Sequence, residues 1–237
     1  MTMKNIIEEL QSVLISNADE KTRISGERYF REEVRMHGLK SALVESIARD
    51  HFKKLPDKAR GYVFGLCEEL WKTGYMEESF IACNWSYAMK KEYKPEDFHV
   101  FDRWVKNYLT NWASCDTLCN HTIGTFIEMY PSFLEELKKW AHSENRWVKR
   151  ASAVTLIIPA RRGKFLNDIF GIADILHPDP DDMVQKGYGW MLKSASQAHQ
   201  NEVFEYVMKK KGTMPRTALR YAIEKMPADM KAKAMAR

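Results

Sequence analysis

The stretch from Pro95 to Trp140, PEDFHVFDRWVKNYLTNWASCDTLCNHTIGTFIEMYPSFLEELKKW, carries the pattern that decides the fold. Its apolar residues recur every three or four positions, which is the period of helices that bury one face. Pro131 stands 36 residues after Pro95, and both prolines stand where a helix begins, because the first helical turn needs no donor from proline. The prolines of this kind, separated by 39, 36, 49 and 35 residues, are Pro56, Pro95, Pro131, Pro180 and Pro215.

The same helical period runs through the rest of the chain. It predicts a first helix over Ile6–Leu14 and a second over Ile24–Val34. Ser143 is the expected N-cap of a later helix that reaches Ile158 and must stop or kink at Pro159. We find no alternating strand pattern. Two-helix repeats run at roughly 35–47 residues, so the proline spacing favours a solenoid of stacked helical hairpins over the alternative, one irregular helical bundle.

Length and composition describe a globular chain. Its 237 residues, 45% of them hydrophobic, can bury a sizeable core, and we expect a single domain over residues 1–237. No run approaches the roughly 18 apolar residues of a membrane span. The start, MTMKNIIEEL, lacks the basic-then-apolar form of a signal peptide. We therefore expect a cytoplasmic protein that does not bind membranes.

The cysteines do not form a metal-binding pattern. Cys115 and Cys119 could join His121 as ligands, but a fourth ligand is missing and the spacing matches no zinc motif. Neither these two nor Cys67 and Cys83 stand in a C-x-x-C pair. We expect four reduced thiols in the core and no metal.

Positive charge is segregated along the chain. Residues 1–137 hold 18 Lys and Arg against 22 Asp and Glu, whereas residues 138–237 hold 19 against 10. The segment Lys138–Lys164 alone has 8 basic residues and 1 acidic residue. The positive electric field around such a segment attracts phosphate polyanions. A solvated helix face with no partner would show the same excess of basic residues, and this remains the alternative. Tryptophans interleaved with the basic residues favour nucleic acid as the partner.

Trp112 and Asp116 form the most unusual pair in the sequence. They stand four residues apart, so a helix places the indole and the carboxylate on one face, one turn apart. A buried carboxylate without a partner costs several kcal/mol, and an exposed indole wastes apolar surface, so the pair points to a ligand. The alternatives are that Trp112 is a core residue and that Asp116 is a charge favoured near a helix start. Tryptophan recurs with basic residues at helical spacing: Trp147 with Arg150, and Trp190 with Lys186 and Lys193.

The order and separation of these fragments resemble the AlkD-type DNA glycosylases, HEAT-like-repeat enzymes that remove alkylated bases from DNA. Three motifs of that family are matched: W-x-x-x-D at Trp112 and Asp116, W-x-x-R at Trp147 and Arg150, and Q-K-x-x-G-W-x-L-[KR] at Gln185, Lys186, Gly189, Trp190, Leu192 and Lys193. The sequence departs from the family pattern at Asn111, Ala113, Asp182, Met183 and Ser41–Ala42.

The resemblance implies a fold, a partner and roles for individual residues. The implied fold is an all-α, right-handed helical-repeat solenoid of about six HEAT-like helix pairs, with a concave basic groove that holds duplex DNA containing alkylated bases. The implied catalytic residues are Asp116, Trp112 and Trp190, and the implied DNA-binding residues are Arg150, Lys193, Lys186 and Lys149. Trp147 is expected in the core, with Arg150 toward solvent. We expect a monomer that needs no cofactor.

The implied reaction suits these groups. A purine that is cationic through N3 or N7 alkylation leaves as a neutral base, while the deoxyribose becomes positively charged in the transition state. An ionised Asp116 would stabilise that charge, and could also orient the attacking water. Indole faces attract cations by about 0.5–2 kcal/mol. The resemblance implies work from the sugar-phosphate side of the lesion. The expectation is therefore a glycosylase for purines such as 3-methyladenine and 7-methylguanine; the alternative is a non-catalytic helical-repeat module that binds damaged or branched DNA, or a protein.

Overall fold

Every regular element of the protein is a helix. The computed structural model describes residues 2–236, and within them an isolated bridge between Arg35 and Tyr75 is the only strand-like pairing. The all-α expectation is confirmed. The chain divides into two compact units, one ending at Leu118 and the other beginning at Cys119, and each is described by itself.

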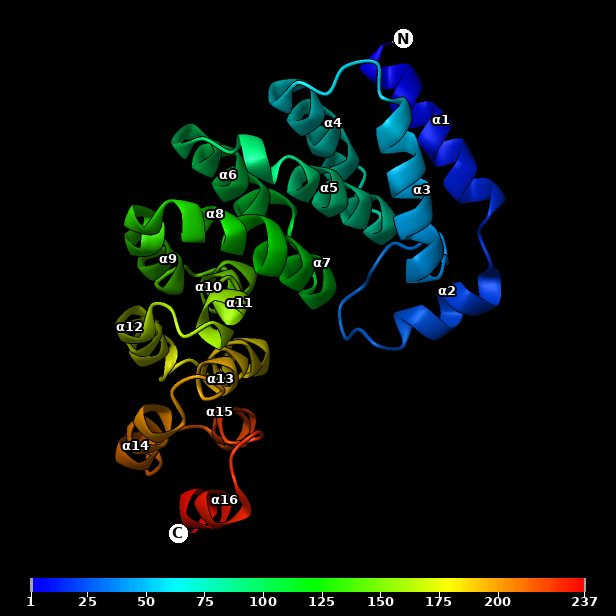
Figure 1. The fold of residues 1–237 in the computed structure, drawn as a ribbon. Coiled ribbons are helices and arrows are strands. Elements are labelled where there is room, and N and C mark those ends of the chain that lie inside the picture. The colour runs from blue at the N-terminus through cyan, green and yellow to red at the C-terminus, as the bar shows by residue number, and fades with distance from the viewer. Residues whose placement is uncertain (1, 237) are drawn as a thin grey trace. The chain divides into compact units, whose positions relative to one another are not determined.

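The first unit packs helices in two rows. Its elements are α1 (Met3–Ser16), α2 (Glu20–Glu27), α3 (Ser41–Lys54), α4 (Arg60–Lys72), α5 (Met76–Ala88), the 3-10 turns η1 (Lys90–Glu92) and η2 (Pro95–Asp97), α6 (Phe98–Tyr108) and α7 (Trp112–Thr117). Helix α5 packs against α3, α4 and α7, and α4 also packs against α6 (Figure 1). Trp85, Phe101 and Trp104 are fully buried between them. The Trp85 indole donates a hydrogen bond to the Ala48 carbonyl at 2.9 Å, which satisfies the polar atom of this buried ring.

A carboxylate at the edge of this core joins α4 to α6. Glu68 accepts hydrogen bonds from the side chains of Arg103, Trp104 and Tyr108. Burial raises the pKa of Glu68, but those three hydrogen bonds outweigh it, and the pKa lies below its ordinary value. The folded state therefore stabilises the ionised form of this group.

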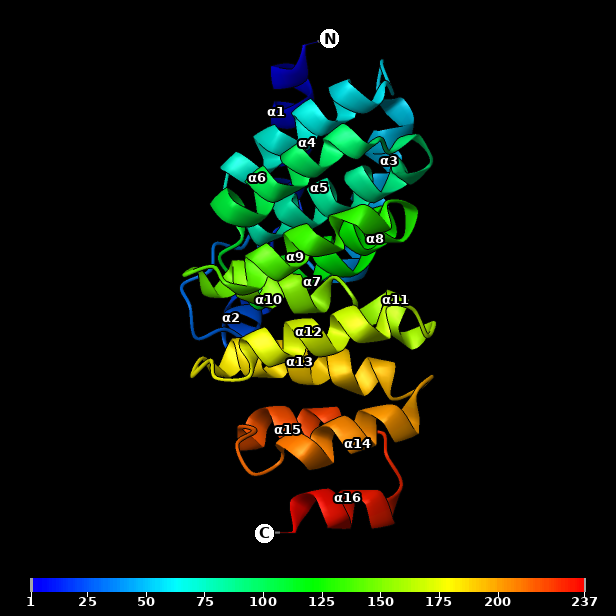
Figure 2. The same ribbon diagram turned by 90° about the vertical axis from the view of Figure 1, so that its left-hand side faces the viewer.

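The second unit repeats the two-row arrangement. Its elements are the π-helical turn η3 (Leu118–Ile123), α8 (Gly124–Met129), the 3-10 turn η4 (Pro131–Phe133), α9 (Leu134–Ala141), α10 (Arg146–Val154), α11 (Ile157–Arg161), α12 (Leu166–Leu176), α13 (Asp182–Ala195), α14 (Gln200–Lys210), α15 (Arg216–Ala222) and α16 (Ala228–Met235). Helices α9, α12 and α14 form one row and α10, α13 and α15 the other, as Figures 1 and 2 show. Helix α13 contacts α10, α12 and α15, which makes it the centre of the unit.

The prolines mark helix starts with one exception. Pro95 and Pro131 open the 3-10 turns before α6 and α9, and Pro215 is the N-cap of α15. Pro180 lies two residues before α13. The helix expected to begin at Pro56 instead begins at Arg60, after a turn in which the Asp57 carboxylate accepts the Ala59 amide at 2.7 Å.

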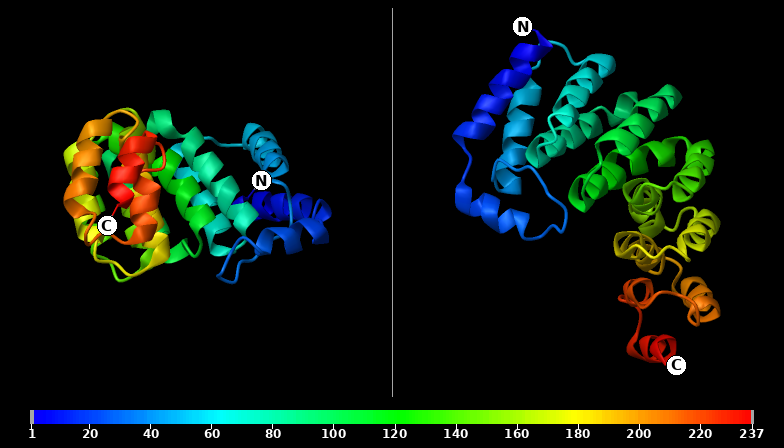
Figure 3. Two further views of the ribbon diagram at one scale, coloured as in Figure 1. Left: turned by 90° about the horizontal axis from the view of Figure 1, so that it is seen from below. Right: turned by 180° about the vertical axis from the view of Figure 1, so that it is seen from behind.

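Three expected helix boundaries were wrong. Helix α2 ends at Glu27, because none of its residues is buried and no core holds the pattern beyond it; a long loop then leads to α3 (Figure 3). Asn145, not Ser143, caps α10, accepting the Trp147 amide at 2.8 Å. The break expected at Pro159 comes earlier, after Val154, and proline then lies within the first turn of α11, where it is tolerated. Helix α16 was not expected.

Candidate functional site

Helix α7 places Trp112 and Asp116 one turn apart on one face, as the sequence predicted. The helix starts where it does because the Asn111 side chain accepts the Ser114 amide at 2.9 Å. Asn111, one of the departures from the family pattern, is thus the N-cap of this helix. A π-helical turn follows directly, and such turns are frequent at functional sites.

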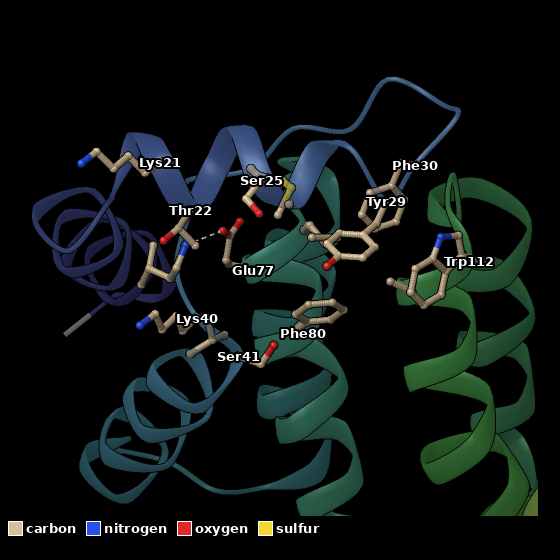
Figure 4. A pocket seen from close by; sticks show the side chains of 16 residues that line it. Lys21, Thr22, Ser25, Tyr29, Phe30, Lys40, Ser41, Glu77, Phe80 and Trp112 are labelled. Carbon is tan, nitrogen blue, oxygen red and sulfur yellow. Dashed lines mark hydrogen bonds between the residues drawn. The ribbon is translucent and has the colours of Figure 1, made fainter.

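Trp112 is a partly exposed residue at the edge of a cavity. Its ring stacks on Phe30, with 5.2 Å between centroids and 17° between planes. Together with Tyr29 and Phe80 it lines an open cavity of about 620 Å³ that lies within the first unit (Figure 4). The interpretation of Trp112 as a plain core residue therefore fails.

Asp116 is the least accessible of the expected catalytic residues. It retains 9% of its surface, and its neighbours Ser114 and Cys115 are buried with it. A ligand would reach only the edge of this side chain. Asp116 lies on the helical face that the sequence predicted, but its carboxylate is not open to solvent.

Helix α13 places Lys186, Trp190 and Lys193 on one face, at intervals of four and three residues. All three side chains are partly exposed. Gly189 allows α13 to approach α15 closely, because a Cβ atom there would lie 2.7 Å from the Tyr221 Cβ. The glycine of the Q-K-x-x-G-W motif therefore fixes the helix that presents Trp190.

Each of the three lysines expected to bind DNA is held by a carboxylate. Lys149 Nζ lies 2.7 Å from Asp179 Oδ2, Lys186 Nζ lies 3.1 Å from Asp182 Oδ2, and Lys193 Nζ lies 2.9 Å from Glu224 Oε2. Asp182 is one of the departures from the family pattern, and here it neutralises a lysine of the motif. Phosphate binding at these lysines would have to displace a carboxylate.

Arg150 does not face solvent, so that expectation was wrong. Only 5% of its surface is exposed, its Nη1 donates to the Met183 carbonyl at 2.6 Å, and its Cγ would lie 3.3 Å from a Cβ atom at Gly187. The side chain packs under α13. Trp147 is buried, as expected, and the Arg146 guanidinium lies over its ring at 5.1 Å.

Sequence reasoning did not single out two arginines of α15. Arg216 and Arg220 stand one turn apart, are exposed, and take part in no ion pair within residues 2–236. They carry the kind of uncompensated charge that was expected of Lys149, Lys186 and Lys193. Their sequence context, RTALRYA, has no feature that distinguishes them from ordinary surface residues.

The other sequence-derived expectations concern cysteines and membranes. Cys67, Cys83, Cys115 and Cys119 are free and buried, as expected, and burial raises the pKa of the Cys67 thiol. Across the described part of the chain, no cluster of three or more His, Cys, Asp or Glu side chains could hold a metal ion. None of the described helices is both long and apolar enough to cross a bilayer.

The fold and these residues define an all-helical repeat protein with tryptophans beside charged side chains on α7 and α13. The model of the family described as "DNA alkylation repair enzyme" matches residues 10–226, and the chain belongs to that family. Its fold is similar to that of a solved structure described as a predicted DNA alkylation repair enzyme from Enterococcus faecalis, with a TM-score of 0.78 and 14% sequence identity over 90% of this chain and 98% of that one. Among curated proteins, none matches the sequence.

Proposed function

We propose that the protein is a DNA glycosylase that hydrolyses the N-glycosidic bond of cationic N3- or N7-alkylated purines in duplex DNA. The observation that carries this proposal is the pair on α7, in a chain of the DNA alkylation repair family: a partly exposed indole, Trp112, one turn from the carboxylate of Asp116.

In the proposed mechanism Asp116 supplies negative charge where the deoxyribose becomes positive. An alkylated purine leaves as a neutral base and needs no acid catalyst, so the remaining requirements are stabilisation of the sugar cation and a positioned water. A fixed carboxylate stabilises the transition state more than the ground state, because the charge it meets is larger there.

The tryptophans and the basic residues of α10, α13 and α15 have supporting roles in this proposal. Trp112 on α7 and Trp190 on α13 each present a ring face of the kind that attracts cations. Lys149, Lys186 and Lys193 bind phosphates after leaving their carboxylates, whereas Arg216 and Arg220 bind them directly. Arg150, which is buried, supports α13 and reaches DNA only if that packing opens.

Release of free base is the direct test. We expect wild type to release 7-methylguanine from an N7-methylated duplex and Asp116→Asn to release at least about 100-fold less, in the range found when one preorganised charge is removed. DNA affinity should stay within about threefold. Trp147→Phe is the matched control, because Trp147 is a buried tryptophan to which the mechanism assigns no chemistry.

The second candidate function is non-catalytic binding of damaged or branched DNA, and the low exposure of Asp116 favours it. On that reading wild type binds DNA but releases no base, and Asp116→Asn behaves like wild type. A loss of base release confined to the Asp116 variant would instead exclude it.

A further inference from the structure

The cavity beneath α2 shares Trp112 with the site proposed above, but that reaction uses none of its other lining residues. Its lining comes from α2, the loop after it, and the first turns of α3, α5 and α7, all within the first unit (Figure 4). Its volume of about 620 Å³ falls within the roughly 300–1,000 Å³ of small-molecule sites.

One end of the cavity is aromatic and uncovered. Tyr29, Phe30, Phe80 and Trp112 line it, and Figure 4 shows their rings gathered at the end nearest α7. None of the four is fully buried, and Tyr29 is 75% exposed. Rings of this size contribute most to stability when covered. Four rings that remain partly exposed give less stabilisation than covered rings would, and a bound ligand with a flat face would cover them.

The other end of the cavity is cationic. Lys21 on α2 and Lys40 before α3 stand there, away from the aromatic end in Figure 4. Both side chains are exposed, and neither makes an ion pair within the described residues. This contrasts with Lys149, Lys186 and Lys193, each of which is held by a carboxylate.

The carboxylate in the cavity wall is already satisfied. Glu77 accepts the backbone amides of Gly38 and Leu39 at 2.8 and 3.1 Å through Oε1, and the amide of His37 at 3.0 Å through Oε2. These bonds fix the end of the loop that follows α2. Gly38 has φ of 93°, and a Cβ atom there would collide with the Asp19 carbonyl, so this position of the loop requires glycine.

The roof of the cavity is held at its ends and by the contact between the Phe30 and Trp112 rings, and none of its helical residues is buried. Helix α2 has no buried residue, its N-cap is Asp19, and the Asp19 amide donates to the Gly38 carbonyl at 3.3 Å. The segment Asp19–Gly38 is thus a strap that stands over an open space.

We propose that this cavity binds one unpaired nucleotide of a DNA strand, with the base against the aromatic end and the adjoining phosphates at Lys21 and Lys40. Every base has a flat face that stacks on aromatic rings, and each stacking contact is sequence-tolerant. A ring-binding end together with a cationic end fits a nucleotide better than a purely apolar ligand. The inference rests on the DNA binding in the proposed function but not on base release.

Three duplexes test the proposal by fluorescence anisotropy: one fully paired, one with a single bulged adenosine, and one with a bulged abasic nucleotide. We expect wild type to bind the bulged adenosine about 5- to 140-fold more tightly than the abasic bulge, the range of one base stacked on aromatic side chains. Tyr29→Ala should lose most of this preference. Since Tyr29 is largely exposed, its removal leaves the fold intact.

Tyr62→Ala on α4 is the matched control, because Tyr62 is a partly exposed tyrosine outside the cavity, and it should bind like wild type. Lys21→Ala with Lys40→Ala should reduce the slope of log affinity against log salt by about one to two for the bulged duplex. Equal affinity for the adenosine and abasic bulges, or an unchanged preference in Tyr29→Ala, overturns the proposal. So does free deoxyadenosine monophosphate that competes as well as the bulged duplex, since the site would then be one for mononucleotides.

The outcome is independent of catalysis. If the protein prefers the bulged adenosine through Tyr29 but releases no base, the nucleotide site is supported and the proposed glycosylase activity is refuted. If it releases base but shows no such preference, the glycosylase activity is supported and the nucleotide site is refuted.

Discussion

Substituting Asp182 should strengthen DNA binding. Asp182 is the only ion-pair partner of Lys186 within residues 2–236, at 3.1 Å, and both side chains are about 30% exposed. An ion pair at this exposure is worth about 0.2–1 kcal/mol. A phosphate must replace that free energy before it binds Lys186, so Asp182→Asn should tighten DNA binding by about 1.4- to 5-fold.

The salt dependence isolates the mechanism of that gain. If Lys186 is freed for one more phosphate, the slope of log affinity against log salt should become steeper by about 0.9. Arg146 also approaches Asp182, at 3.6 Å, but remains paired with Asp181 at 2.8 Å, so no second phosphate contact is expected. Because Asp182 lies in the first turn of α13, the change should lower stability by about 0.3–1 kcal/mol, which thermal unfolding measures.

Asp168→Asn is the matched control. Asp168 is also a first-turn acid, of α12, and it pairs with Lys138 at 2.9 Å, but Lys138 keeps Glu135 as a second partner at 2.6 Å. Its salt slope should match that of wild type. The reasoning is refuted if Asp182→Asn leaves the slope unchanged, or if its effect persists in a Lys186→Ala background, where the pair no longer exists.

Three further substitutions test the structure away from DNA. Gly189→Ala should lower the free energy of unfolding by about 1–3 kcal/mol, because its Cβ would lie 2.7 Å from the Tyr221 Cβ; a wild-type midpoint in urea contradicts the close α13–α15 packing. Arg150→Ala should also lower the free energy of unfolding by about 1–3 kcal/mol, because packing and one hydrogen bond are lost. Lys186→Ala, the control, should change it by less than about 0.5 kcal/mol. Equal effects of the two substitutions would mean that Arg150 is a surface residue. Because the pKa of Glu68 is lower in the folded protein than its ordinary value of 4.5, the ionised carboxylate stabilises the fold above pH 4.5, and this stabilisation is lost as pH falls through the folded pKa. Glu68→Gln should therefore lose less stability than wild type when the pH is lowered below 4.5. An unchanged dependence of the free energy of unfolding on pH would show that the ionised carboxylate contributes nothing.

The helical fold followed from the sequence because its signals are local. An apolar period of three to four residues and prolines at helix starts depend only on neighbours in the chain. Pro95 and Pro131 were expected where helices begin, and each opens the 3-10 turn that leads directly into a helix. Where no core supported the pattern it misled: Ile24 suits a helix that continues toward Val34, yet α2 ends at Glu27.

The positions of Trp112 and Asp116 on one helical face were also predictable, since spacing alone determines them. The exposure of single side chains was not. Arg150 and Lys193 are both cations on helices that pack against other helices, yet Arg150 lies against Gly187 and is buried whereas Lys193 is partly exposed. Ion-pair partners are equally hard to predict from the sequence, because residues such as Lys193 and Glu224 pair although they stand 31 positions apart.

The acidic segment Asp179–Asp182 changes what the charge of the second unit means. Its three aspartates hold Lys149, Arg146 and Lys186, so a formal excess of basic residues is not an equal excess of available charge. Counterion release then drives DNA binding less than the sequence suggests, because each cation must first leave a carboxylate. Contacts that do not depend on charge, such as stacking on Trp190 or on the aromatic end of the cavity under α2, then contribute a larger share of the binding free energy. An unpaired nucleotide offers those contacts and intact duplex does not, so on the proposed function we expect the protein to bind distorted DNA more tightly than intact duplex.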